Sequence, residues 1–250
     1  MYQGDDLVHH SLISTALSMG LLSPLEVCTR VAAAVAPLAA REGFIRQIIG
    51  WREYVHQFFE FYQDDIHTVN HFAHTTPLPS FFWGKRYGAE ASPLGMKCVD
   101  KVIERVDRLA YSHHIERLMV IGNFTLLSGH DPHSVNHWFW EQYADAYEWS
   151  VTPNVIAMSQ FADGGRLASK PYIASANYID KMSDSCKGCK YDKSEKYGDT
   201  ACPFNYLYWS FVDTHRDEFI RGRQPFILNQ LPKLDLIKLQ EQKKIFLERM

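Results

Sequence analysis

Apolar residues recur at helical spacing along most of this 250-residue chain. Within residues 42–63, Phe44, Ile48 and Trp51 fall three or four positions apart, as on one face of an α-helix. Residues 97–110 repeat the pattern. Capping residues followed by proline favour two further helix starts, at Ser23-Pro24-Leu25-Glu26 and at Asp131-Pro132. We also expect helices at 203–220 and 233–248, with the first of the capped helices ending near Pro37.

Glycine and proline interrupt the helical pattern mainly at 74–96 and 183–203. No run alternates polar and apolar residues as a strand does, and no strand–helix alternation or internal repeat is present. No stretch has the composition of a linker. The sequence therefore predicts one all-α domain.

Composition excludes several classes of protein. Hydrophobic residues make up 46% of the chain and charged residues 22%, values of a globular protein rather than a disordered one. No apolar run approaches the ~18 residues of a membrane span, and the polar N-terminus is not a secretory signal. We therefore expect a cytoplasmic protein with no membrane partner. A net charge of −3 excludes coating of nucleic acid through bulk charge, but allows a local basic groove.

Three of the five cysteines lie close together, as Cys186-Lys187-Gly188-Cys189 and Cys202. Two thiolates three positions apart can hold a metal ion or one edge of an iron–sulfur cluster. A fourth ligand would come from elsewhere, with Cys98 and Cys28 as the candidates. Spacing alone does not separate zinc from iron–sulfur. A redox dithiol and unligated thiols are the other interpretations.

Several strings together resemble the photolyase/cryptochrome family over nearly all of the chain. They include a tryptophan–arginine–glutamate helix, a turn that cradles flavin, and the pair His113-His114. With the cysteines, they narrow the resemblance to the prokaryotic iron–sulfur branch, which includes bacterial (6-4) photolyases and related cryptochromes. The strings are Ala16–Pro24, Phe44–Tyr54, Met158–Gly165, Ala168–Tyr172 and the set Cys98, Cys186, Cys189 and Cys202.

The resemblance implies that residues 1–250 form the FAD-binding helical domain with a [4Fe-4S] cluster. The N-terminal α/β domain of the family is absent, so an antenna chromophore is not expected. A separate α/β photolyase domain is a candidate partner, and UV-damaged DNA is the expected substrate. A second departure from the family is a longer glycine- and proline-rich stretch between Trp83 and Cys98.

The resemblance also implies roles for individual residues. Arg117 and Asp163 would form an ion pair beside the flavin ring. His113, His114 and Tyr172 would face the lesion, with His114 as the main proton donor. Electrons would pass through tryptophans alone, since Phe139 stands where the relay can carry a tyrosine. The remaining expected site residues are Ser11, Ser14, Gly164 and Lys170 for the cofactor, Trp83 and Trp138 for the relay, Gln47, Trp51 and Arg166 for DNA, and Cys98, Cys186, Cys189 and Cys202 for the cluster.

The function implied is light-driven repair of (6-4) photoproducts by electron transfer from reduced FAD. One alternative is a cryptochrome-like photoreceptor without repair. Another is an inactive fragment that needs its α/β domain. Outside the family, the residues also suit a zinc-stabilised helical binding module.

Overall fold

A computed structural model describes residues 1–2, 4–7, 9–90, 92–222 and 224–250. Over these residues the chain contains helices and no strand, apart from the isolated bridges Thr76–His130 and Asp192–Ala201. The predicted all-α fold is confirmed. None of the described helices combines the length and apolar character needed to cross a bilayer.

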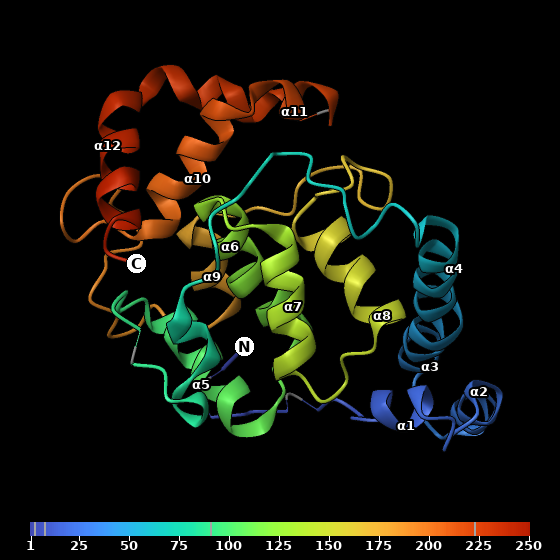
Figure 1. Ribbon diagram of the computed structural model, residues 1–250. Coiled ribbons are helices and arrows are strands. Elements are labelled where there is room, and N and C mark those ends of the chain that lie inside the picture. The colour runs from blue at the N-terminus through green and yellow to red at the C-terminus, as the bar shows by residue number, and fades with distance from the viewer. Residues whose placement is uncertain (3, 8, 91, 223) are drawn as a thin grey trace.

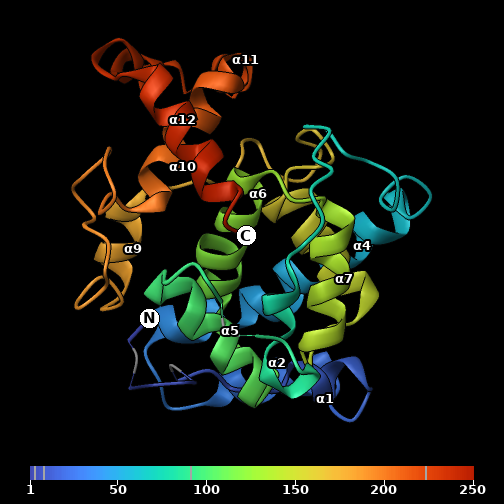
Figure 2. The same ribbon diagram turned by 60° about the vertical axis from the view of Figure 1, so that its left-hand side comes forward.

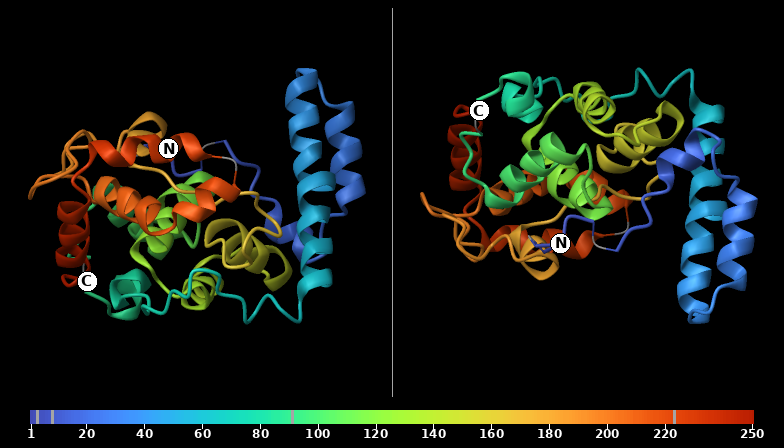
Figure 3. Two further views of the ribbon diagram at one scale, coloured as in Figure 1. Left: turned by 90° about the horizontal axis from the view of Figure 1, so that it is seen from above. Right: turned by 90° about the horizontal axis from the view of Figure 1, so that it is seen from below.

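The first part of the chain forms a helical hairpin at one edge of the molecule (Figures 1 and 3). After the short helix α1 (Ser14–Ser18), helix α2 (Pro24–Ala33) lies beside a continuous rod. The rod consists of α3 (Leu38–Ile45), the π-helical stretch η1 (Arg46–Trp51) and α4 (Arg52–Tyr62). The expected helix at 42–63 is therefore confirmed, and the structure starts it at Leu38.

The two helices that were expected from capping residues followed by proline begin in different ways. Asp131 accepts a hydrogen bond from the backbone N–H of Ser134 (2.8 Å) and so caps the next helix, as expected. The Ser23 side chain makes no such bond, although its helix does begin at Pro24. The fixed φ of Pro24 therefore sets the start of this helix.

The middle of the chain forms the body of the molecule (Figures 1 and 2). Its elements are the 3₁₀ turns η2 (Ser80–Trp83) and η3 (Lys85–Tyr87), α5 (Lys97–Leu109), η4 (Glu116–Gly122) running into α6 (Asn123–Ser128), α7 (Pro132–Gln142), and α8 (Glu148–Thr152) running into η5 (Pro153–Ser159). The stretch from Leu118 to Ser128 is buried throughout. Because it has no polar face, it lacks the periodic pattern that identifies a surface helix, and the sequence did not predict it.

The last part of the chain packs against α6, and its helix α10 makes that contact. Its elements are α9 (Ala176–Met182), α10 (Pro203–Thr214), α11 (Arg216–Arg221), η6 (Pro225–Lys233) and α12 (Leu236–Leu247). The expected helix at 203–220 is broken at His215, whose φ of −113° and ψ of 39° are not helical. The largest core cluster joins this part to the body through Phe124, Trp138, Phe204 and Phe211. Cys28 is buried in a smaller cluster under the hairpin, as a core thiol.

Candidate functional site

Three π-helical stretches meet around one cavity. A π-helical turn holds more residues than an α-helical one and often marks a functional site. Here η1, η4 and η5 all contribute to the wall, together with the extended segment before α1. Gly122 allows η4 and η5 to lie close, because a Cβ at this position would overlap the Ser159 hydroxyl and stand 3.0 Å from the Arg117 carbonyl oxygen.

The cavity has a volume of about 530 Å³, and its lining is mostly apolar. That volume is in the ordinary range for cofactor and ligand sites, which combine an apolar lining with a few convergent polar groups. The predicted residues that line it are Ser11, Ser14, Gln47, Trp51, His114, Arg117 and Phe139.

Arg117 supplies the main positive charge of the cavity wall. Its guanidinium donates to both carboxylate oxygens of Asp145, at 3.0 and 3.1 Å. Its Nε donates to the Ser112 carbonyl (2.9 Å), and its plane lies 4.3 Å from the centroid of the buried Tyr143 ring. Ser14 adds a hydroxyl donor to Asp145 at 3.3 Å. The bidentate geometry fixes the orientation of the cation as well as its place.

The predicted pairing of Arg117 with Asp163 is wrong, because Asp145 holds that position. Asp163 instead accepts hydrogen bonds from the backbone N–H groups of Gly165 and Leu167, both at 2.9 Å. Burial raises the pKa of Asp163, and these two hydrogen bonds oppose the rise. This carboxylate therefore organises the turn at 163–167.

The residues expected around this turn do not line the cavity. Gly164 has a φ of +68°, and a Cβ there would stand 3.0 Å from the His71 ring. Arg166 pairs with Asp65 (2.9 Å) and lies over the Tyr62 ring. Lys170 and the partly exposed Tyr172 are likewise absent from the cavity wall. The turn thus forms a separate surface beside η5.

The two adjacent histidines have different environments. His114 is exposed to the cavity yet has protein atoms closely around it, and burial together with Arg117 lowers its pKa. His113 does not line the cavity; its Nδ1 accepts the backbone N–H of Ile115 at 3.1 Å. Its ring stacks on His10 with centroids 4.6 Å apart, and burial lowers its pKa to about 4. His114 is thus the one of the pair that can reach a ligand in the cavity.

An aromatic path leads from the cavity to the surface. Phe139 lines the cavity, and its ring centroid lies 4.9 Å from that of Trp138. Trp138 is fully buried, contacts Phe82 at 5.5 Å and donates to the Phe82 carbonyl (2.8 Å). Trp83 follows Phe82 in η2, is partly exposed, and donates to Glu141 at 2.7 Å. Trp83 is therefore joined to Trp138 through the main chain of Phe82.

The four predicted cluster cysteines surround a second, small pocket. Cys98 lies in the first turn of α5, and Cys202 precedes Pro203 at the start of α10. Hydrogen bonds already join the two segments: Lys97 donates to the Lys187 carbonyl (2.6 Å), and Tyr191 donates to the Leu94 carbonyl (2.9 Å). Within the described ranges, no three His, Cys, Asp or Glu side chains converge closely enough to hold a single metal ion.

Sequence reasoning missed several residues of the cavity. Asp145 was missed because it lies 28 positions from Arg117 and belongs to no local motif. His10 and Tyr111 were missed because their side chains come from irregular segments. One signal was readable: His113-His114-Ile115-Glu116 directly precedes an apolar run, a variant of the capping box with histidine in the first position.

Comparisons with known proteins agree with the resemblance. The chain is 50% identical over 223 residues to a (6-4) photolyase of Agrobacterium fabrum, a match that covers 87% of this chain and 42% of that protein. It is 38% identical over 112 residues to an uncharacterized protein of Acanthamoeba polyphaga mimivirus, covering 45% of this chain and 83% of the viral protein. No family model matches the chain. The chain thus spans less than half the length of the bacterial relative.

Proposed function

Because the chain belongs to the photolyase family, we propose that it takes part in light-driven repair of (6-4) photoproducts in UV-damaged DNA, with FAD bound in the cavity between η1, η4 and η5. One observation carries the proposal. The cavity has on its wall both a fixed cation, the Arg117–Asp145 pair, and an exposed imidazole, that of His114.

The residues of the cavity suit a flavin nucleotide. Apolar and aromatic side chains line most of the wall, as a flat ring system requires. The Ser11 and Ser14 hydroxyls would bind phosphate oxygens, and the guanidinium of Arg117 would stabilise negative charge on the ring. Bound FAD, once reduced and excited by light, supplies the electron that drives the repair.

His114 would deliver the proton. In the free protein its lowered pKa keeps the imidazole neutral near pH 7. A DNA phosphate that approaches the ring favours the protonated form and raises this pKa. The donor would therefore form when substrate binds. Gln47 and Trp51, which also line the cavity, would contact the extruded bases, with Trp51 as a stacking surface.

Trp138 and Trp83 would carry electrons inward from the surface. The contact between Trp138 and Phe139 brings the first tryptophan to the cavity wall. Phe139 is not itself an accessible radical site, so electrons would hop between the tryptophans.

We further propose that Cys98, Cys186, Cys189 and Cys202 hold a [4Fe-4S] cluster with a structural role. Four thiolates from two segments suit this cluster, since each binds its own iron and they need not converge as the ligands of a single ion do. The cluster would add a covalent link where Lys97 and Tyr191 already join the two segments.

Since this chain covers 42% of the bacterial relative, an α/β domain supplied separately is a candidate partner. Exposed apolar side chains of the hairpin, among them Leu21, Leu25, Val35 and Leu38, would suit such contacts.

The test is repair of an oligonucleotide with one (6-4) photoproduct by anaerobically purified, photoreduced protein under blue light. We expect repair by the wild type and its loss in His114→Ala at unchanged flavin content. Flavin that photoreduces without repair would indicate a photoreceptor. A colourless zinc protein would exclude the flavin and cluster assignments. Recovery of flavin only on addition of an α/β domain would assign this chain to a two-part enzyme.

A further inference from the structure

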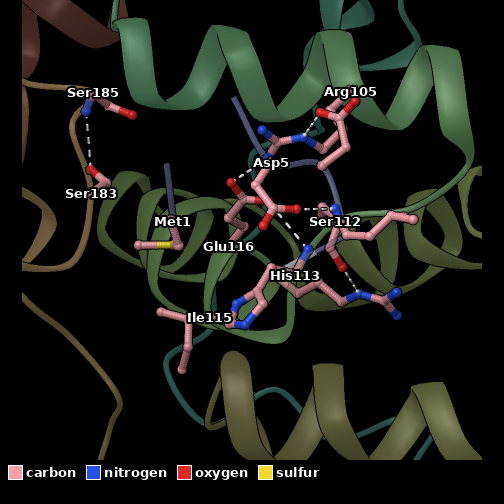
Figure 4. Close-up of polar contacts among 12 residues, drawn as sticks. Met1, Asp5, Arg105, Ser112, His113, Ile115, Glu116, Ser183 and Ser185 are labelled. Atoms are coloured by element: carbon pink, nitrogen blue, oxygen red, sulfur yellow. Dashed lines mark hydrogen bonds and ion pairs between the residues drawn. The ribbon is translucent and has the colours of Figure 1, made fainter. Parts of the chain in front are cut away.

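The helix that carries His114 begins with a reciprocal cap (Figure 4). The Glu116 carboxylate accepts the backbone N–H of His113 at 3.2 Å, while the His113 ring accepts the backbone N–H of Ile115 at 3.1 Å. The pattern resembles a capping box, with a histidine ring in the place of a serine hydroxyl and with the N–H of the second helical residue, not the third, as its donor. It satisfies two backbone donors that a helix start leaves free.

A buried ion pair orients the glutamate of this cap. Arg105, on the inner face of α5, binds Glu116 through one guanidinium nitrogen and donates its Nε to Asp6 at 3.0 Å. Both Arg105 and Glu116 are less than 10% exposed. Burial opposes ionisation of Arg105, yet the hydrogen bonds and charges of Glu116 and Asp6 together raise its pKa, so the guanidinium remains charged. Asp6, in the N-terminal segment, thus binds the same guanidinium as Glu116.

A buried ion pair does little for net stability, because desolvation cancels most of the attraction. Its advantage over an apolar pair is a defined geometry. Here Arg105 binds Glu116, and Glu116 in turn accepts the backbone N–H of His113, the residue immediately before His114. Arg117 holds the other end of the same peptide group, the carbonyl oxygen of Ser112. The peptide group between Ser112 and His113, just before His114, is thus held at both its C=O and its N–H.

We propose that Glu116, oriented by Arg105, is a positioning residue that fixes the backbone before His114 and so aims its imidazole into the cavity. The inference deepens the proposed repair and rests on it. Glu116 acts through the main chain of His113 and does not line the cavity itself. The arrangement requires His113 to be neutral with its proton on Nε2, because Nδ1 is an acceptor.

The tautomer gives a readout that does not depend on activity. In the full chain with ¹⁵N-labelled histidine, we expect His113 to show one neutral tautomer, protonated on Nε2, at pH 7, with His113→Asn assigning the signal. Glu116→Gln keeps a carbonyl acceptor and should keep the tautomer. Glu116→Ala should give a tautomer mixture and exchange the His113 amide about tenfold faster, as loss of one hydrogen bond predicts.

Glu104→Gln is the matched control. Glu104 lies beside Arg105 on α5 but on the exposed face of that helix, paired with Lys101 at 2.6 Å. The Glu104→Gln variant should leave the His113 tautomer, the exchange of the His113 amide and the repair rate unchanged. If Glu116→Ala does not fold, Arg105→Lys replaces it, because lysine keeps the charge but cannot bridge Glu116 and Asp6 through a planar fork. Arg105→Lys should change the tautomer, the amide exchange and the repair rate in the same direction as Glu116→Ala, but by less.

Repair kinetics complete the test. Misaiming His114 should lower kcat about tenfold in Glu116→Ala with KM within about twofold, and Glu116→Gln should restore most of the loss. A Glu116→Ala protein with wild-type tautomer, exchange and kcat would overturn the inference, as would equal loss in Glu116→Gln. If the wild type repairs nothing, the proposed function fails, while the tautomer and exchange measurements still decide whether Glu116 holds this turn.

Discussion

Arg117 and Asp145, 28 positions apart in the chain, meet as a bidentate ion pair on the wall of the cavity. One comes from the π-helical stretch η4 and the other from the loop between α7 and α8. The pair therefore joins two parts of the body and presents a fixed cation to a ligand.

Replacing Arg117 by methionine should weaken FAD binding about 10- to 100-fold, because a hydrogen-bonded charge is lost and the Asp145 carboxylate is left without its partner. Fluorescence titration of the apoprotein with FAD measures the effect. Arg166→Met is the control, since Arg166 pairs with Asp65 away from the cavity. Equal weakening in both variants would contradict the assignment.

Trp138→Phe should slow photoreduction of bound flavin by at least an order of magnitude, since it removes the buried member of the aromatic path. Repair by chemically reduced protein should stay close to the wild-type rate. Transient absorption after a blue flash measures the first effect. Trp209→Phe, a partly buried tryptophan of α10, serves as the comparison and should photoreduce normally.

Cys186→Ser should lower the iron content of anaerobically purified protein to a small fraction of the wild-type value, because a cluster needs all four thiolates. Iron and sulfide analysis measures it. Cys28→Ser should retain iron, as Cys28 lies in a separate core cluster. Retention of full iron in Cys186→Ser would argue against the proposed ligand set.

Gly122→Ala should destabilise the fold by about 1–3 kcal/mol, since the new methyl group overlaps Ser159 and forces η4 and η5 apart. Gly50→Ala should instead stabilise it by about 0.5–1 kcal/mol, because nothing lies within 4 Å of its Cβ and alanine favours helix. Urea denaturation of the two variants measures both. The same sign of change for both would refute the close approach at Gly122.

Stability should fall as the pH drops from about 6.5 toward 4. Burial lowers the pKa of His74 to about 4, with the charges of His215, Lys243 and His130 adding to the shift. The unfolded chain, with histidine near 6.5, therefore binds more protons in this range and is favoured, whereas above pH 6.5 the effect vanishes. His74→Gln should make the free energies of unfolding at pH 5 and pH 7, from urea denaturation, more alike by about 2 kcal/mol.

Sequence reasoning found the fold class and the long helices, and it singled out the four cysteines that surround one pocket and His114 on the cavity wall, because each leaves a local pattern or belongs to a recognisable string. It misassigned the partner of Arg117 because ion pairs across the fold follow no spacing rule. It assigned His113 to the lesion, whereas the structure gives this ring a capping role. The stretches 118–128 and 155–160 escaped prediction because burial on all sides removes periodicity.

The three π-helical stretches also bear on how such a cavity arises. Each residue of an α-helix turns the chain by about 100° around the helix axis. One extra residue in a turn therefore moves the side chains that follow it to a different face of the helix. Deleting a single residue from η1, η4 or η5 would restore α-helical phase and turn the wall residues of that stretch away from the cavity. The cavity of about 530 Å³ thus depends on the helical phase that each of the three stretches sets for its wall residues.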